Sequence, residues 1–265
     1  MSHYFRWIGA LFAAFPLSVG ASEATDQFAP FSDLSSSSAC SFCVGVQQKR
    51  GETPPFRAGM RRQTAFQMAA SWNAAETIRI RLSMETLSVV WPNGDQSRGW
   101  GDLRVGTRAL LLDSDTAWWP QIELDWGVKL PNAGDDSGLG SDETDFFSGL
   151  YFRWAITDWE LGVGGGLLIL GDPLQFANQD DAGFFAAYFS RDFGVARLSS
   201  MVDWRLESPR NPADGRVLFG LQSRPFGAGL WTAIRGGVGL TAAAPDWQAS
   251  IRLGINAPCR RAQGD

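Results

Sequence analysis

The feature that most constrains this chain is a regular alternation of apolar and polar side chains, repeated many times along the sequence. In residues 78–85, two Ile, a Leu and a Met alternate with two Arg, a Ser and a Glu. A side-chain period of two is typical of a β-strand with one apolar and one polar face. The pattern returns in residues 121–130, 197–206 and 247–256. The sequence therefore predicts an all-β fold.

The length of these runs indicates which kind of β-protein this is. They extend over about ten residues or more, roughly twice the usual length of a strand in a soluble protein. A tilted strand needs about ten residues to cross a bilayer. Because a charged side chain at the bilayer midplane costs ~2–4 kcal/mol, the charged faces would point into a lumen. A soluble β-sandwich would place them outside, and alternation alone does not separate the two.

Tryptophan placement and an export signal favour the membrane alternative. Many of the twelve tryptophans lie where alternating runs begin or end. Amphipathic aromatic rings favour the headgroup level, so we expect girdles at both membrane interfaces. Core tryptophans of a sandwich are the competing interpretation. We predict a transmembrane antiparallel up-and-down β-barrel in the cell outer membrane of a Gram-negative bacterium. The candidate girdle residues are Trp72, Trp91, Trp100, Trp118, Trp159, Trp231 and Trp247.

The first residues predict a signal peptide at 1–21. His3 and Arg6 precede an apolar run, and Val19, Gly20 and Ala21 form a small-residue cleavage site. A single anchor helix is the alternative interpretation of this run. A serine-rich stretch follows, and we interpret residues 22–41 as a flexible periplasmic leader. The barrel is expected at 42–256, with a periplasmic tail at 257–265.

Short and long connections alternate along the chain, and this alternation predicts the topology. The connections at 157–158, 192–193 and 225–227 are tight, whereas those at 131–143, 171–181 and 208–214 are longer. Outer-membrane barrels have short periplasmic turns and longer outer loops. The clear strands alone would leave the N-terminus outside, and a further strand at 42–48 returns both ends to the periplasm. We expect about twelve strands, with ten or fourteen as the error range.

Charge and histidine content limit the possible functions. The net charge is −5, and no clustered basic face indicates nucleic acid as a partner. The one histidine, His3, lies in the predicted signal peptide, which excludes His-dependent hydrolase mechanisms and removes the commonest zinc ligand. We therefore expect no enzyme activity, and no catalytic, cofactor-binding or metal-binding residues. The expected partners are outer-membrane lipid and a small-molecule solute.

The polar faces supply the candidate functional residues, which line the predicted lumen. Basic groups outnumber acidic ones among them, and a positive lining in a narrow, low-dielectric channel favours anions. The alternative is a non-conducting barrel whose lumen is plugged by paired charges. The lumen candidates are Arg79, Arg81, Glu85, Asp102, Arg104, Arg108, Glu123, Asp125, Lys129, Arg153, Glu160, Arg197, Asp203, Arg205, Arg216, Arg224, Arg235 and Arg252.

Three motifs carry a resemblance to a known family. They are the Trp-Gly-Asp-Leu-Arg-Val-Gly segment at 100–106, the strand at 120–131 that ends Gly-Val-Lys-Leu-Pro, and the Gly-Leu-Gly-Ser loop at 138–146. In this order they resemble the outer-membrane transporter-like family labelled for the meta-pathway of phenol degradation. The resemblance covers roughly residues 99–255. The loop after Pro131 departs from the family pattern, as does the end of the chain, which lacks the terminal aromatic residue that barrels use as an assembly signal.

The resemblance implies a function in transport across the outer membrane. It implies a monomeric or weakly associated barrel that carries aromatic or other hydrophobic compounds. Apart from the resemblance, we expect the barrel-assembly machinery as a partner of any such barrel. The resemblance brings no catalytic residues to this chain. Together with the lumen charge, it predicts a channel or transporter for small solutes, either hydrophobic compounds or small anions.

The chain has three cysteines, Cys40, Cys43 and Cys259. They flank the predicted barrel, whose closure would bring the two ends together in the oxidising periplasm. We expect one of Cys40 and Cys43 to bond Cys259 and join the first strand to the last. Chain entropy suggests a stabilisation of roughly 4–5 kcal/mol for so long a loop. A local Cys40–Cys43 bridge is the competing outcome.

Overall fold

The structure is a computed structural model. It describes residues 40–51, 62–91, 93–114, 116, 118–132, 139, 144–170, 180–208, 212–223 and 229–257. The predicted signal peptide and nearly all of the predicted leader and tail lie outside these residues. Within the described ranges, no helix has the length and apolar character needed to span a membrane.

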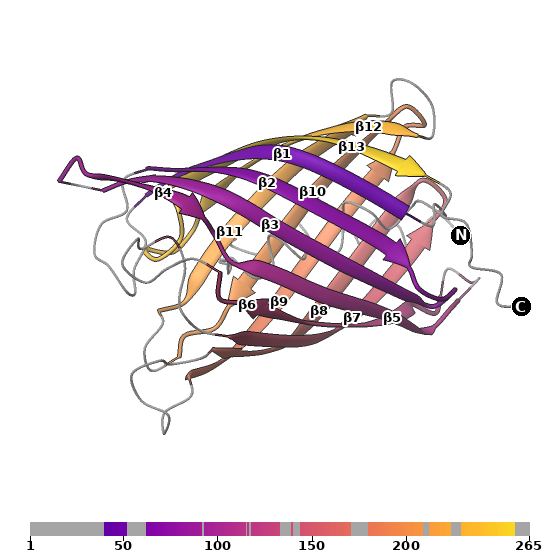
Figure 1. The fold of residues 1–265 in the computed structure, drawn as a ribbon. Helices are drawn as coiled ribbons and strands as arrows, with labels where there is room; N and C mark the ends of the chain where they lie inside the picture. The colour runs from indigo at the N-terminus through magenta and orange to yellow at the C-terminus, as the bar shows by residue number, and fades with distance from the viewer. Residues whose placement is uncertain are drawn as a thin grey trace, which may run out of the picture.

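The described residues form a single barrel of long β-strands (Figure 1). The strands tilt strongly relative to the barrel axis, as closure of a sheet requires. Their bounds are β1 (Cys40–Arg50), β2 (Arg62–Asn73), β3 (Ile78–Val90), β4 (Gln96–Trp100), β5 (Leu103–Leu112), β6 (Gln121–Leu130), β7 (Asp145–Ile156), β8 (Trp159–Leu170), β9 (Asp180–Asp192), β10 (Ala196–Arg205), β11 (Asp214–Ser223), β12 (Leu230–Gly239) and β13 (Trp247–Ala257).

The sheet closes through the pairing of its first and last strands. β1 pairs antiparallel with β13 along its whole length, from Cys40 opposite Ala257 to Arg50 opposite Trp247. The barrel begins two residues before the expected start, so Cys40 as well as Cys43 lies within β1. Closure removes both edges of the sheet, which satisfies the backbone groups that lipid cannot.

The thirteen strand segments make twelve barrel strands, because β4 and β5 both pair with β3 and together act as one. The two segments are separated by Gly101 and Asp102, which both stand opposite Glu85. The backbone N–H of Gly101 donates to the carbonyl oxygen of Glu85 at 2.8 Å. Two residues opposite one define a β-bulge, which bends the strand and redirects its side chains. The predicted twelve-stranded antiparallel barrel is confirmed.

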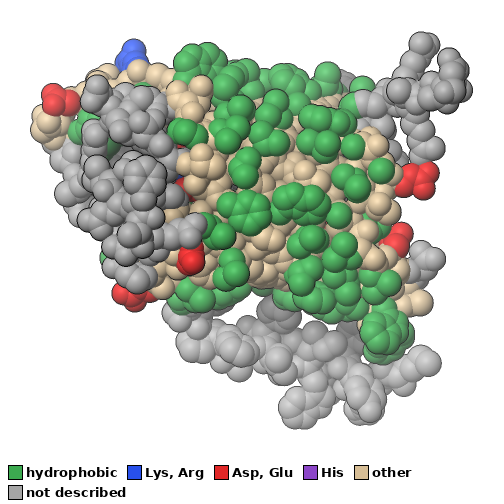
Figure 2. Space-filling model, turned by 60° about the horizontal axis from the view of Figure 1, so that its bottom comes forward, with side chains coloured by type: hydrophobic (Ala, Val, Ile, Leu, Met, Phe, Trp, Pro, Cys, Tyr) green, Lys and Arg blue, Asp and Glu red, His purple; other side chains and the backbone are tan. Residues whose placement is uncertain are grey.

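The outer surface of the barrel is apolar around its middle. Val46, Ile251 and Ile234 lie side by side on neighbouring strands and are 43%, 57% and 57% exposed. Figure 2 shows one such face, covered by hydrophobic side chains, with charged side chains near its two ends. A soluble protein would not expose so large an apolar surface. This surface faces the hydrocarbon of the membrane, as the alternation predicts.

The strand connections follow the predicted alternation of short and long. β7 and β8 are joined by two residues, Thr157 and Asp158, and β9 and β10 by residues 193–195. β1 begins and β13 ends at the same end of the barrel as these short turns. By the rule for outer-membrane barrels this is the periplasmic end, and the opposite end faces outward from the cell.

The tryptophans divide between the two faces, which corrects part of the predicted girdle. Trp72 and Trp159 are exposed at the periplasmic ends of their strands, and Trp100 is exposed toward the outer end. Trp231, however, is only 2% exposed and lies inside the barrel. Trp91 packs on the inner cluster of Leu87 and Val89. The position of a tryptophan near a strand end does not determine which face of the strand its ring occupies.

The assignment of the lipid face generates a prediction about charge at two depths. Ile251→Arg, in the middle of the apolar surface, should destabilise the barrel by about 2–4 kcal/mol. Gln48→Arg, on the same face near the outer end of β1, should cost no more than about 1 kcal/mol. Urea unfolding of both variants in lipid bilayers measures the difference. Equal costs at the two positions would contradict the assignment.

Candidate functional site: the lumen of the barrel

The inward faces of the strands bring many of the predicted lumen residues into contact. Asp125 of β6, which has no solvent exposure, lies between two arginines. It forms ion pairs with Arg81 of β3 and with Arg108 of β5, the latter at 2.7 Å between Oδ2 and Nη2. Arg108 also lies 3.6 Å from Glu123. Removal of these charges from water is costly, and pairing offsets that cost.

The same network continues around the barrel wall in its periplasmic half. Arg153 of β7 lies 3.4 Å from Glu123 and 3.9 Å from Glu160 of β8. Glu160 lies 3.6 Å from Arg197 of β10, which also pairs with Asp192 of β9 at 3.3 Å. Charges of opposite sign thus alternate along the wall from β3 to β10. We call this set the ion-pair belt.

A second group of ion pairs lies nearer the outer end. Arg104 of β5 pairs with Glu85 of β3 at 3.3 Å. Lys129 of β6 lies 2.5 Å from Asp145 and 3.5 Å from Asp102. Asp102 belongs to the β-bulge, and its Oδ1 also accepts the backbone N–H of Asn132 at 3.3 Å. Asp102 has the same parity as the inward-facing Arg104 and Arg108 of β5, and its carboxylate faces the lumen with them.

The wall formed by β10 to β13 has a different character. A cavity of about 30 Å³ lies there, with room for about two water molecules. Arg197, Arg235 and Arg252 line it together with small and polar residues, and no carboxylate occurs among the described residues that line it. Arg252 donates from Nη2 to Gln67 Oε1 at 3.2 Å. We call this group the arginine wall.

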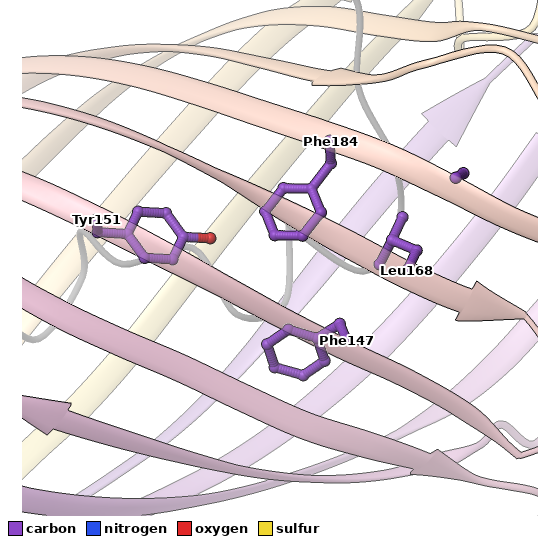
Figure 3. Packing of buried hydrophobic residues seen from close by; sticks show 5 residues of the cluster. Phe147, Tyr151, Leu168 and Phe184 are labelled. Carbon is purple, nitrogen blue, oxygen red and sulfur yellow. The ribbon is translucent and has the colours of Figure 1, made fainter.

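Aromatic rings line the lumen between β6 and β9, and they lie against glycines. A Cβ added to Gly164 of β8 would be 2.2 Å from Cδ1 of Tyr151, and one added to Gly149 of β7 would be 2.7 Å from Cζ of Phe184. Figure 3 shows these two rings with Phe147 along neighbouring strands. Absence of a side chain at each glycine lets a ring lie flat on the backbone. We call this surface the ring wall.

Other predicted lumen residues lie apart from these groups. Arg79 donates to Asn73 at 2.9 Å, near the periplasmic end. Arg205 donates to the carbonyl oxygen of Pro212 at 3.3 Å. Asp203 and Arg216 are opposite each other on β10 and β11, and both are fully buried. Arg224 lies outside the described residues.

Several lumen residues were absent from the prediction. Lys49, Gln47 and Gln67 face inward on β1 and β2, and Asp145 and Asp192 complete ion pairs at strand ends. Strict counting of parity along β7 and β9 would have found the two aspartates. β1 offers a weaker signal, because residues 47–50 are polar on both of its faces.

The cysteine prediction is only partly within the described residues. Cys40 is in a disulfide bond, and Cys43 is not, so a local bridge between the two is absent. Cys259 lies outside the described residues, and its bond with the first strand stays a prediction. Cys40 stands opposite Ala257, two residues before Cys259. Among the described residues no cluster of three His, Cys, Asp or Glu side chains is arranged to hold a metal ion.

Comparison with solved structures places this fold among outer-membrane barrels. An outer-membrane channel from Pseudomonas putida F1 matches with a TM-score of 0.57 and 12% identity, over 82% of this chain and 95% of that one. The NanC porin matches with a TM-score of 0.53 and 12% identity, over 83% and 100%. The KdgM porin, in complex with disordered oligogalacturonate, matches with a TM-score of 0.51 and 8% identity, over 83% and 99%.

Sequence comparison adds no closer relative: no family model matches the chain, and no curated protein matches it. The fold is therefore the shared property. The closed twelve-stranded barrel, its apolar outer surface and its charged interior define a transmembrane β-barrel of the outer membrane.

The ion-pair belt predicts an asymmetry between inner and outer ion pairs. Asp125→Asn removes the fully buried carboxylate that pairs with both Arg81 and Arg108 and leaves less negative charge beside these two cations, so it should lower the free energy of unfolding by roughly 3–5 kcal/mol. Asp158→Asn breaks a solvent-exposed pair with Arg191 and should cost about 1 kcal/mol or less. Urea unfolding compares the two variants. A negligible effect of Asp125→Asn would show that these charges are not buried together.

Proposed function

We propose that this barrel is a narrow diffusion channel for small solutes, and that its preferred solute is a small organic anion with an aromatic or other apolar body. The observation that carries the proposal is the division of the lumen into an arginine wall without lining carboxylates and a ring wall. We infer transport rather than catalysis, because the residues that distinguish this barrel are the arginines and aromatic rings that line its lumen.

The arginine wall supports the preference for anions. In the ion-pair belt, the basic side chains Arg108, Arg153 and Arg197 face carboxylates at less than 4.0 Å. At the cavity between β10 and β13, Arg235 and Arg252 face serine, glutamine and glycine residues. Arg252 donates to the neutral side chain of Gln67, and the low-dielectric walls of the barrel focus the field of this cation into the passage. An anion that passes here replaces part of its hydration with guanidinium contacts.

The ring wall supports a preference for an apolar body. Tyr151 and Phe147 lie on β7, which is five strands from β12 and six from β13 in the strand order, whereas Phe184 lies on β9, three and four strands away. A solute between the two walls would meet aromatic faces on one side and cations on the other. This arrangement fits an aromatic or aliphatic carboxylate better than it fits an uncharged hydrocarbon or an inorganic ion.

The proposal also joins two expectations that the sequence left separate. The resemblance to the phenol-degradation family implies aromatic or hydrophobic cargo, and the lumen charge favours anions. KdgM, a porin of the same fold, holds an oligogalacturonate, which is a chain of sugar carboxylates. An aromatic carboxylate has both the ring and the charge.

A non-conducting barrel is the second candidate, and the ion-pair belt is the observation that favours it. Belt residues extend inward from β3 to β10 and narrow the lumen there. Single-channel recording in planar bilayers separates the two candidates. Discrete conductance steps support the channel, whereas an electrically silent barrel with heat-modifiable migration on gels supports a plugged lumen.

The arginine wall generates a prediction about ion selectivity. Wild-type channels in a salt gradient should give a reversal potential of the sign that indicates anion preference. Arg235→Gln with Arg252→Gln removes two of the lining cations and should move that potential toward zero or reverse it. Arg191→Gln, on the outer surface of the barrel, is the matched control and should leave it unchanged. An unchanged reversal potential in the double variant would refute the proposal that anions pass along the arginine wall.

The ring wall generates a prediction about channel width. Gly164→Ala would place its Cβ 2.2 Å from the Tyr151 ring and 2.8 Å from the carbonyl oxygen of Leu150, so the ring must move off the wall and into the lumen and single-channel conductance should fall. Gly236→Ala on β12, where the nearest atom is 4.0 Å away, should have no effect. Tyr151→Ala in the Gly164→Ala background should restore much of the conductance, because it removes the ring and leaves only the contact with the carbonyl. Without this rescue, displacement of the ring is not the cause.

A further inference from the structure

Three exposed arginines lie on the outer surface of the barrel, at the end away from the short turns. Arg50 ends β1, Arg62 begins β2, and Arg98 lies in β4. Lys49 is opposite Gln63, so the same register places Arg50 directly opposite Arg62. Arg98 is opposite Ser88, two residues along β3 from the position opposite Arg62. The three charges therefore form a patch across adjacent strands.

The patch lies at the level of the lipid headgroups. A step of ten residues along β2 separates Arg62 from Trp72. This step is about 33 Å along the strand and about 25 Å along the barrel axis at the usual tilt, which equals the height of the apolar belt. Trp247 is opposite Arg50 on the other side of β1. Tryptophan rings favour the interface, so both measures agree on the depth.

The patch has no counter-charge in the described part of the chain. None of the three arginines forms an ion pair there, and Arg98 donates only to the neutral side chain of Gln96 at 3.2 Å. Like charges directly opposite each other on neighbouring strands are destabilising. The outward-facing arginine at the periplasmic end is different, since Arg191 pairs with Asp158 at 2.8 Å and stacks on Trp159.

From these observations we propose that Arg50, Arg62 and Arg98 bind the phosphate groups of the outer-leaflet glycolipid, lipopolysaccharide. Guanidinium groups match phosphate oxygens with paired hydrogen bonds. Two arginines on adjacent strands and a third about two strand spacings away suit a lipid with more than one phosphate. The site lies on the lipid-facing surface, so it is independent of what passes through the lumen.

The test is lipid binding to the whole barrel, reconstituted in phosphatidylcholine nanodiscs and titrated with lipid A, with occupancy followed by native mass spectrometry. Each basic group near an anionic surface contributes on the order of fivefold in affinity. Arg50→Gln with Arg62→Gln should therefore weaken lipid A binding by about tenfold or more. Arg50→Lys with Arg62→Lys should retain much of it. Arg191→Gln, at the opposite end, should bind as the wild type does.

Two comparisons on the wild-type barrel keep the proposal testable without any variant. Lipid A should bind more tightly than dephosphorylated lipid A and more tightly than phosphatidylglycerol. Equal binding of lipid A with and without its phosphates would overturn the site. Equal binding of phosphatidylglycerol would overturn its assignment to the glycolipid. Undiminished binding by a glutamine double variant that keeps heat-modifiable migration would overturn the role of these arginines.

Discussion

The pairing of β1 with β13 is the contact on which the other features of this barrel depend. It extends over the whole of both strands, from Cys40 opposite Ala257 to Arg50 opposite Trp247. An unpaired strand edge in lipid would leave each N–H and C=O unsatisfied at a cost of several kcal/mol. Closure removes that cost and gives the sheet an inside and an outside. Only after this closure does one face of each alternating strand point into the lumen and the other face toward lipid.

Once the sheet is closed, the charged face of each strand is confined to a narrow interior. Charges held there with little water are tolerable when they are paired, and Asp125 between Arg81 and Arg108 shows how the barrel achieves this. Such pairs form between strands, so they also fix side-chain positions across the wall. Around Arg252 the described lining of the cavity holds arginines but no carboxylate, and this is where we propose that an anionic solute binds.

Space is the second constraint inside a barrel of this size, because large side chains on every strand would fill it. Glycines on β7 and β8 reduce this crowding, because aromatic rings of the lumen can lie close to the backbone where a glycine has no side chain. Tyr151 lies against Gly164 and Phe184 against Gly149, so these rings stay close to the barrel wall. Trp231 covers Gly254 on β13 in the same manner. Different residues thus provide the charge of the lumen lining and its aromatic surface.

The sequence by itself determined the faces, the topology and the strand number, because a period of two and the placement of short turns are local properties. It also placed Arg81 and Asp125 on inward faces. Only the tertiary structure decided that these two residues meet, since register joins positions 44 residues apart. It likewise decided that a bulge at Gly101 and Asp102 joins β4 and β5 into one barrel strand and that Arg50 stands beside Arg62. Register and bulges depend on how neighbouring strands pair, and no pattern within a single strand encodes them.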